Sequence, residues 1–382
     1  MKGVLSSLRK VQAVARKEFY HIIRDYRSLY LAFALPIILI LLFGYALSLD
    51  VDNITTVVVD HDGSAESRDL ARRLDASAYF HVAAYPADTK GAAAWLDAGK
   101  ASLAVIIPPD WGRNLRADRE APLQVIVDGS DPNFGWMTVG YVNAFIEGEN
   151  SRRLKEYLNR LGEGERKPPL EGRIRIWFNE DLESRNLIVP GIIGVIIMIV
   201  GAMLTSLVIA REYENGTMET LKSLPLGAGE FLVGKALPYL LITMADVLTA
   251  VLLGQLLFGI VMKADFLVLL GAVTLYLCVA VSLGLFISAA TRSQIIANQI
   301  APLVTFLPSM LLSDFVFPII NMPAAIRPVT YIVPATYFIN VLKGVYLKNL
   351  GLALLWPNFL VLAAMALLLS LLTFLTLRRE GM

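Results

Sequence analysis

Cysteine, histidine and charged residues are all scarce in this chain of 382 residues. The single cysteine, Cys278, excludes a framework of intrachain disulfide bonds. Only 18% of the residues are charged and the formal net charge is +1, so we expect no bulk electrostatic attraction to nucleic acid. With 56% hydrophobic residues and a mean hydropathy of +0.59, the composition lies outside the range of ordinary soluble proteins.

Residues that could bind a metal or a nucleotide do not form a recognisable site. The histidines, His21, His61 and His81, are far apart, and no cysteine or carboxylate cluster completes a metal-ligand spacing. Residues 229–235 resemble a phosphate-binding loop, but Ala236 stands where Ser or Thr would hold magnesium. We therefore expect no catalytic residue, metal or cofactor in this chain.

The apolar residues are concentrated in long stretches that are almost free of charge. Each stretch is about as long as the roughly 20 helical residues that cross a bilayer. The sequence therefore predicts six membrane spans, the third interrupted only by Asp246. The spans are residues 28–49, 187–210, 236–262, 266–291, 293–313 and 349–377.

Basic residues predict the orientation of the chain. Residues 1–27 form an amphipathic segment rich in Lys and Arg, which the positive-inside tendency places in the cytoplasm. Arg378 and Arg379 follow the last span, and an even number of spans puts the tail, residues 378–382, on the same side. The first span is longer than the apolar core of a signal peptide, so we expect no cleavage.

Residues 50–184 are hydrophilic and follow the first span, which predicts an extracytoplasmic domain. Short β-rich runs alternate there with helical patterns, as expected of an inserted α/β domain. Asp60, His61, Asp62 and Gly63 follow the first run and are ordinary turn residues. The expected strands are residues 55–59, 79–84, 102–107, 123–127 and 173–178, and the expected helices are residues 64–74, 88–99, 109–117 and 133–161.

Residues 314–348 interrupt the pattern of spans. Within them, residues 331–347 are apolar enough for a seventh span, but Pro334, Asn340 and Lys343 break the stretch. A seventh span would also place Arg378 and Arg379 outside. We therefore expect a re-entrant or interfacial hairpin at the outer face.

The cytoplasmic loop of residues 211–235 should contain a short helix. Asn215 and Gly216 break the preceding helix, and Thr217 can cap a new one. Glu219 lies in the first turn, where the helix dipole favours a carboxylate. The apolar residues share one side, which predicts a helix along the membrane surface, unless the loop is a plain connector. They are Met218, Leu221 and Leu224.

This loop resembles the coupling-helix segment of the type 2 ABC exporter permeases (ABC-2 type), specifically of their bacterial multidrug-export branch. The residues that carry the resemblance are Arg211-Glu212-x-Glu214-x-Gly216-Thr217-Met218-Glu219, Leu224-Pro225 and Gly234-Lys235-x-x-Pro238-Tyr239. The similarity spans essentially the whole chain. Supporting segments are Arg16-Lys17-Glu18, Asp128-Gly129-Ser130, Leu311-Leu312-Ser313-x-Phe315-x-Phe317-Pro318, Asn321-Met322-Pro323 and Tyr331-x-x-Pro334-x-x-Tyr337-Phe338.

The resemblance implies a non-catalytic half-transporter in the bacterial inner membrane. Two six-span permease subunits, identical or paralogous, would form the pathway for a drug, a lipid-like compound or another amphipathic cargo. Separate cytoplasmic ABC ATPase chains would bind ATP and Mg²⁺, and the outer domain suits contact with a periplasmic adaptor. The coupling residues that the resemblance implies are Arg211, Glu212, Gly216, Thr217, Glu219 and Leu221, with Lys17 and Glu18 from the N-terminal helix.

Three polar residues are candidates for the translocation pathway. Asp246 lies mid-span, where an ionised carboxylate is costly unless it faces protein or water, so pathway and packing roles both remain open. Asn298 could line an inner vestibule or join helices by hydrogen bonds. Asp314 stands where the family usually has glycine and would place a carboxylate near the outer mouth.

Two other functions are compatible with the sequence. An ion-gradient secondary transporter would use Asp246 to carry the proton, although such carriers usually have repeated halves and several intramembrane acids. A mechanotransmission subunit would move no cargo and would instead use the ATPase to work the outer domain. Loss of pH-driven flux in Asp246→Asn would favour the first, and intact ATPase stimulation without transport would favour the second.

Overall fold

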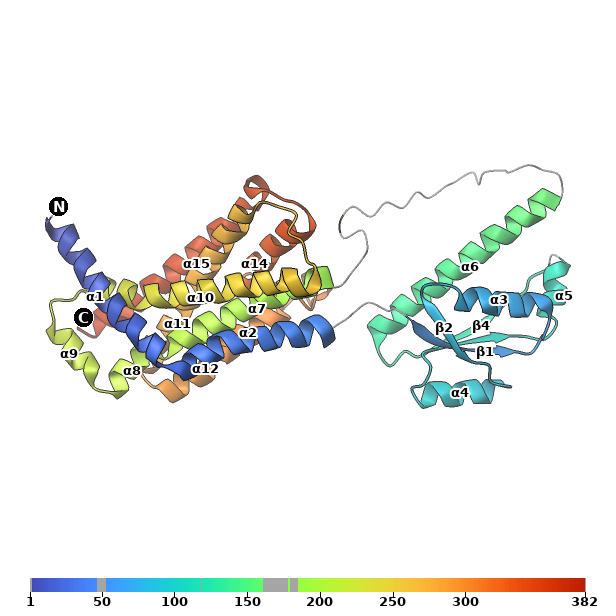
Figure 1. Ribbon diagram of the computed structural model, residues 1–382, viewed down its shortest axis with the longest axis horizontal. Coiled ribbons are helices and arrows are strands. Elements are labelled where there is room, and N and C mark those ends of the chain that lie inside the picture. Colours follow the sequence, from blue (N-terminus) through green and yellow to red (C-terminus); the bar gives the residue numbers. More distant parts are fainter. Residues whose placement is uncertain (1, 47–52, 118, 161–177, 179–184, 382) are drawn as a thin grey trace. The chain divides into compact units, whose positions relative to one another are not determined.

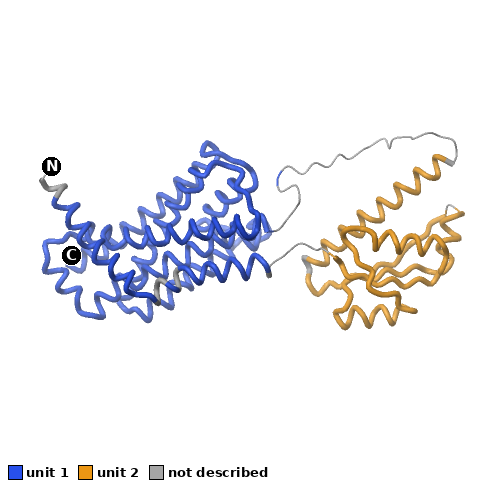
Figure 2. The backbone as a smooth tube through the Cα atoms, viewed as in Figure 1, with its two compact units in different colours: residues 1–48, 176–382 blue, residues 49–175 orange. Residues whose placement is uncertain are grey.

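The computed structural model describes residues 2–46, 53–117, 119–160, 178 and 185–381. The chain divides into two compact units, one of residues 1–48 and 176–382 and the other of residues 49–175 (Figure 2). We call them the larger and the smaller unit. Each has its own hydrophobic core.

A four-stranded sheet forms the centre of the smaller unit, with strand order β2-β1-β3-β4. β1 pairs in parallel with β2 and β3, while β3 and β4 are antiparallel. The strands are β1 (Ile54–Asp60), β2 (Phe80–Ala84), β3 (Leu103–Ile107) and β4 (Gln124–Val127). The helices are α3 (Ala65–Asp75), α4 (Thr89–Asp97), α5 (Trp111–Arg116) and α6 (Pro132–Arg160).

Helices cover both faces of this sheet (Figure 1). Successive residues of a strand point to opposite faces, so Val58 packs with Leu70 of α3 and Val142 of α6, whereas Val57 packs with Ala92 of α4. Each of the first four strands that the sequence predicts overlaps an observed strand. The fifth, residues 173–178, lies almost wholly outside the described residues.

The turn after β1 is built by its own carboxylates, in line with its interpretation as a turn. Asp60 Oδ1 accepts the backbone N–H groups of Asp62 and Gly63, and Asp62 Oδ2 accepts that of Gly112 at 3.0 Å. Desolvation raises the pKa of Asp62, but hydrogen bonds from Ser64 and Gly112 outweigh it and hold this pKa below its ordinary value. These polar groups therefore hold α5 against the turn.

The larger unit is a bundle of long apolar helices. Among the described residues, five helical stretches are long and apolar enough to cross a membrane: Arg185–Glu214, Ala228–Phe258, Phe266–Thr291, Gln294–Leu311 and Leu352–Arg379. The first comprises α7 (Arg185–Ser206) and α8 (Val208–Glu214), and the others are α10, α11, α12 and α15. The first predicted span corresponds to α2 (Tyr26–Ala46), which contributes the shorter apolar stretch Phe33–Tyr45. That the first predicted span, residues 28–49, also crosses the membrane stays a prediction, and with it the total of six.

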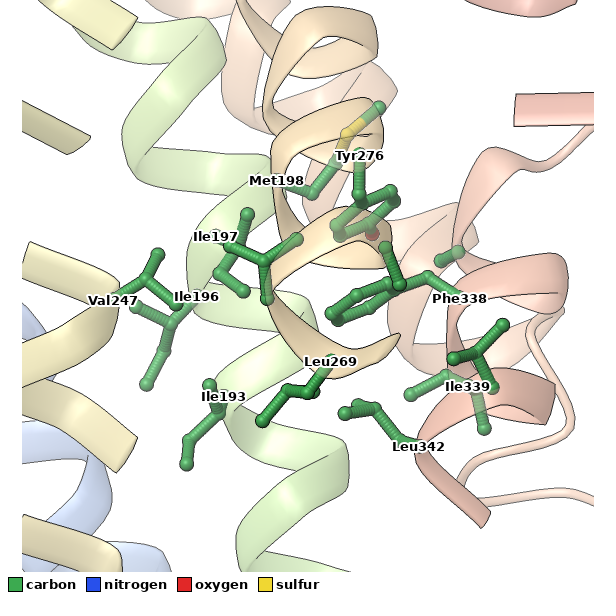
Figure 3. Close-up of a cluster of buried hydrophobic side chains, with 14 of the residues drawn as sticks. Ile193, Ile196, Ile197, Met198, Val247, Leu269, Tyr276, Phe338, Ile339 and Leu342 are labelled. Atoms are coloured by element: carbon green, nitrogen blue, oxygen red, sulfur yellow. The ribbon is translucent and has the colours of Figure 1, made fainter. Parts of the chain in front are cut away.

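Helix α7 lies at the centre of the bundle and is buried along most of its length. Its residues Ile193, Ile196 and Ile197 belong to the main core, which Figure 3 shows together with residues of α10, α11 and α14. In that core the rings of Tyr276 and Phe338 stack with their centroids 4.2 Å apart. Packing against protein on several sides explains why this span has no polar face.

Small residues allow α7 and α11 to cross closely. A Cβ atom added at Gly201 would lie 2.9 Å from Cβ of Ala280, and one added at Gly284 would overlap Thr205 Oγ1 and the carbonyl oxygen of Ala202. The Thr205 hydroxyl donates to the Gly201 carbonyl at 2.7 Å. Close contact through small residues is a usual way for helices to associate in membranes.

Short elements fill the segment between α12 and α15. They are a 3-10 turn (Ile319–Asn321), α13 (Arg327–Thr330), α14 (Pro334–Leu342) and a π-helical turn (Lys343–Leu347). Phe338, Val341 and Val345 are completely buried in the main core. As expected, residues 331–347 form no helix long enough to cross a membrane. Their position at the outer face stays a prediction.

Replacing Gly284 with alanine tests the close crossing of α7 and α11. The new methyl group would overlap backbone of α7, which cannot move aside as a flexible side chain can. We expect Gly284→Ala to destabilise the protein by about 1–3 kcal/mol, the usual cost of overpacking, and to lower its thermal unfolding temperature in detergent.

The control is Gly229→Ala in α10, where the added Cβ would lie 3.8 Å from Phe374, an ordinary contact. Equal unfolding temperatures for the two variants would contradict the close crossing.

Candidate functional site

Four charged side chains meet where three helices of the larger unit converge. Lys235 at the start of α10 (Ala228–Phe258) places its Nζ 2.6 Å from Oε1 of Glu18 on α1 (Lys2–Arg24) and 2.5 Å from Oε1 of Glu212 on α8. Lys17 Nζ lies 2.6 Å from the same oxygen of Glu212. We call Lys17, Glu18, Glu212 and Lys235 the ion cluster.

Most of the ion cluster is inaccessible to water. The side chains of Lys235, Glu18 and Glu212 are 2%, 3% and 8% exposed, whereas that of Lys17 is 55% exposed. Buried charges are tolerated when they are paired, and here two cations balance two carboxylates. Removing one partner would leave an uncompensated charge, so the cluster holds α1, α8 and α10 in one arrangement.

Helix α1 can reach this position because Gly234 lets it approach α10. A Cβ atom at Gly234 would lie 2.7 Å from Cβ of Val14 and 3.2 Å from the carbonyl oxygen of Val11. One turn earlier on α10, Glu230 pairs with Lys10 at 3.3 Å. The close contact at Gly234 therefore brings α1 near enough for Glu18 to meet the lysine that follows the glycine.

The predicted short helix is α9 (Thr217–Ser223), which begins after a glycine with φ of +70°. Gly216, and not Thr217 as expected, occupies the N-cap position, because this left-handed conformation suits glycine. The Thr217 hydroxyl instead donates to the carboxylate of Glu212. The start of α9 is thus tied directly to the ion cluster.

Helix α9 has one buried and one exposed face. Met218 is buried with Ile22, Ile209 and Phe231, and Leu221 packs against the same cluster. Met218 and Leu221 therefore pack on protein, whereas Leu224, which the sequence placed on the same apolar side, is exposed. The position of α9 along the membrane surface stays a prediction. The partner side chains lie on α1, α8 and α10, which local hydrophobic periodicity cannot identify. The exposed residues of α9 are Thr217, Glu219, Thr220 and Ser223, and Leu224, directly after the helix, is exposed as well.

Helix α8 is also anchored to the helices beside it. Arg211 contacts His21, lies 3.8 Å from Asp25, and donates to Gln294 Oε1 at 3.4 Å. Glu214 accepts both the backbone N–H of Gln294 at 2.8 Å and its side-chain amide at 2.6 Å. These contacts connect α8 to α1 and to the start of α12 (Gln294–Leu311).

Two further contacts join α8 to α11 (Phe266–Thr291) and to the end of α15 (Leu352–Arg379). Ser288 Oγ accepts the backbone N–H groups of Ile209 at 2.9 Å and Ala210 at 2.8 Å. Tyr213 and Arg292 both contact the carboxylate of Glu380. The short helix between α7 and α9 is therefore held by hydrogen bonds from several helices.

The structure brings most of the predicted coupling residues together. Arg211, Glu212, Gly216 and Thr217 surround the junction of α8 and α9, and Lys17 and Glu18 approach it from α1. Glu219 is exposed on α9, whereas Glu18 and Glu212 are buried. Glu18 and Glu212 thus position helices in this structure, and their role in coupling stays a prediction.

The predicted pathway residues lie in different places. Asp246 is buried on the side of α10 that faces the other helices of the bundle. In the part of the chain that the structure describes, it has no hydrogen-bond or ion-pair partner. Asn298 is exposed on α12. Asp314 follows α12 with φ of +66°, and its Oδ2 lies 2.6 Å from Nζ of Lys343. Their part in translocation stays a prediction.

Sequence reasoning missed the roles of two lysines. In the sequence, Lys235 belongs to the segment that resembles a phosphate-binding loop and to the family motif. Lys343 interrupts an apolar stretch. A lysine inside an apolar helix predicts an acidic partner elsewhere in the fold, because an unpaired buried charge is costly. Among the described residues, no three His, Cys, Asp or Glu side chains are grouped to hold a metal ion.

Comparisons with known proteins agree with the resemblance seen in the sequence. A family model described as "ABC-2 family transporter protein" matches residues 27–375. The chain is 35% identical over 381 residues to the "Probable multidrug ABC transporter permease YbhS" of Escherichia coli (strain K12), covering 100% of both chains. It is 30% identical over 353 residues to "Probable multidrug ABC transporter permease YbhR" of the same strain, covering 91% of this chain and 93% of the other.

A third relative is more distant. The "Inner membrane transport permease YhhJ" of Escherichia coli (strain K12) is 28% identical over 274 residues, which is 71% of each chain.

The ion cluster predicts an asymmetric response to charge removal. Lys235→Met leaves two buried carboxylates with only the half-exposed Lys17 between them. We expect a loss of about 3–5 kcal/mol in stability, the usual cost of breaking a buried pair. Thermal unfolding of the detergent-purified protein measures this change.

Combining Lys235→Met with Glu18→Gln restores a neutral cluster and should recover much of the unfolding temperature. Strictly additive effects of the two substitutions would show that the charges are not coupled.

Proposed function

The chain belongs to the ABC-2 family of transporter proteins, and on that premise we propose that it is the membrane-spanning permease subunit of an ATP-driven exporter. In this proposal a separate ABC ATPase hydrolyses ATP, and α9 receives its motion. The termini and α9 lie in the cytoplasm, and the smaller unit lies outside it.

The exposed face of α9 carries the proposal. A helix that transmits force needs an accessible surface for its partner and a rigid attachment to the spans. Glu219, Thr220, Ser223 and Leu224 supply the surface, while buried Met218 and the bond from Thr217 to Glu212 supply the attachment. Negative Glu219 at the first turn suits a cationic side chain of the ATPase.

Motion of α9 would reach the spans through contacts already described. The ion cluster connects α9 to α1 and α10, and α8 continues toward α7, the most buried span. Closure of the ATP-bound partner subunits would push α9, and two permease subunits would then rock between inward and outward access. Because the joint is buried and paired, it would transmit displacement without deforming.

The cargo and the outer partner belong to the same proposal. YbhS and YbhR carry the words "multidrug" and "permease" in their names, which supports an amphipathic cargo such as a drug or a lipid-like compound. The second permease subunit is an identical or paralogous chain, and the smaller unit suits a periplasmic adaptor. The chain itself has no catalytic role in this proposal.

Reversing the charge of Glu219 tests the coupling assignment. Glu219→Lys would place a cation against the proposed cationic site on the ATPase, and like charges at an interface are repulsive. We expect the ATP hydrolysis that co-elutes with tagged permease from native membranes to fall about tenfold or more, which corresponds to about 1.4 kcal/mol.

Asp97→Lys at the end of α4 is the matched control, since it makes the same charge change on an exposed acid of the smaller unit. Its co-eluting activity should equal that of the wild type. If Glu219→Lys kept both the ATPase and full transport, α9 would not be the coupling helix.

Asp246 favours a second candidate, an ion-gradient transporter, because a buried carboxylate without a described partner is suited to carry a proton. Our proposal predicts otherwise for Asp246→Asn in proteoliposomes with the ATPase. ATP-dependent efflux of a fluorescent amphipathic dye should stay within about threefold of the wild type, which is less than about 1 kcal/mol. Flux driven by a pH gradient alone, independent of ATP and abolished by the substitution, would favour the second candidate.

A further inference from the structure

One side of α1 exposes an apolar strip. Leu8, Phe19 and Ile23 fall on the same side of the helix, and their side chains are 60%, 43% and 51% exposed. Val14, Glu18 and Ile22 pack against α10 and its neighbours, and they lie about a quarter of a turn around α1 from the apolar strip. Exposed Gln12 lies between Leu8 and Phe19, so Phe19 and Ile23, one turn apart, form the continuous part of this strip.

A basic strip runs beside the apolar one. Arg9, Arg16 and Tyr20 are spaced by seven and four residues, so they line up along the helix, and all three are exposed. The guanidinium carbon of Arg16 lies 5.7 Å from the centre of the Tyr20 ring. Within the described residues neither arginine has a carboxylate partner. An open hollow of about 530 Å³ is bordered by Arg9, Arg16 and Tyr20 together with Gln12, Ala13 and Lys17 of the same helix.

The two strips continue into a membrane-facing surface. After α1, the chain enters α2, whose Tyr30, Ile38 and Leu42 are exposed apolar or aromatic side chains. Exposed Tyr20 and Tyr30 flank the junction of the two helices, and tyrosines gather at the boundary between membrane and water. Going around α1, the apolar strip is therefore followed by the basic strip and then by water. Acyl chains, charged headgroups and water follow one another in the same order at the surface of a bilayer.

We propose that the basic strip of α1 binds the headgroup phosphate of an anionic phospholipid, while acyl chains cover Leu8, Phe19 and Ile23. The inference rests on the membrane-spanning permease of the proposed function, with its N-terminus in the cytoplasm, and not on coupling to the ATPase. Two unpaired guanidinium groups can each donate several hydrogen bonds to phosphate oxygens. An anionic headgroup is favoured over a zwitterionic one because no carboxylate of α1 neutralises these two arginines.

The ATPase is the other conceivable occupant of this side of α1. Membrane lipid fits better, because α2, which follows α1 directly in the chain, also exposes large apolar side chains such as Ile38 and Leu42. Lys17 also borders the hollow, but its Nζ lies 2.6 Å from Glu212 Oε1 on α8, and an ATPase bound to α9 would lie on that flank of α1.

Lipid titration of the full-length permease tests the inference without the ATPase. Purified protein in mild detergent is mixed with phosphatidylglycerol, phosphatidylcholine or soluble glycerol phosphate, and its thermal unfolding is followed. A ligand that binds the folded state raises the unfolding temperature. We expect only phosphatidylglycerol to raise it. In the double variant Arg9→Gln/Arg16→Gln, its apparent Kd should increase by roughly 25-fold, since each basic contact is worth about fivefold.

Two matched variants complete the test. Arg9→Lys/Arg16→Lys keeps both charges and should retain most of the response, whereas Arg378→Gln/Arg379→Gln removes two exposed charges after the last span and should respond as the wild type. An unchanged response in Arg9→Gln/Arg16→Gln, an equal loss in the Arg378/Arg379 control, or an equal effect of phosphatidylcholine or glycerol phosphate would overturn the proposal. So would loss of the ATPase from Arg9→Gln/Arg16→Gln with its lipid response intact.

Discussion

The burial of Lys235 between two carboxylates is the constraint on which the cytoplasmic end of this protein depends. A lysine in the first turns of an apolar helix needs a counter-charge, and here it has Glu18 and Glu212, each within 2.6 Å of its Nζ. Meeting that need places α1 across α10 and brings α8 beside both. The position of α9 then follows, because Thr217 bonds to Glu212 and Met218 enters the apolar cluster below.

Away from this cluster, close packing holds the bundle together. Lipid tails are as apolar as leucine, so helices in a membrane gain little by hiding apolar surface from one another and rely on contact and hydrogen bonding. The crossing of α7 and α11 through Gly201 and Gly284 is such a contact. The same bundle pairs Asp314 with Lys343, so a carboxylate that the sequence placed at an outer mouth is an ion-pair partner.

Sequence reasoning reached local features well and long-range ones poorly. It located the short helix after Gly216 and the place of Glu219 in its first turn, because turn chemistry and helix capping depend on adjacent residues. It did not identify the helices on which Met218 and Leu221 pack, because an apolar side shows that a helix needs a partner but does not identify that partner. The contact between Glu18 and Lys235 joins residues 217 positions apart, a distance over which one sequence carries no pairing signal.

The amino-acid sequence by itself determined which segments are long and apolar, where the α/β unit interrupts them and to which family the chain belongs. These properties follow from composition and motifs that can be read a few residues at a time. Only the tertiary structure decided that Glu18 and Glu212 are buried, that Lys235 joins them, and that Arg9 and Arg16 remain unpaired among the described residues. Burial and pairing depend on how distant helices pack, because the energy of a charge is set by the neighbours around it in space.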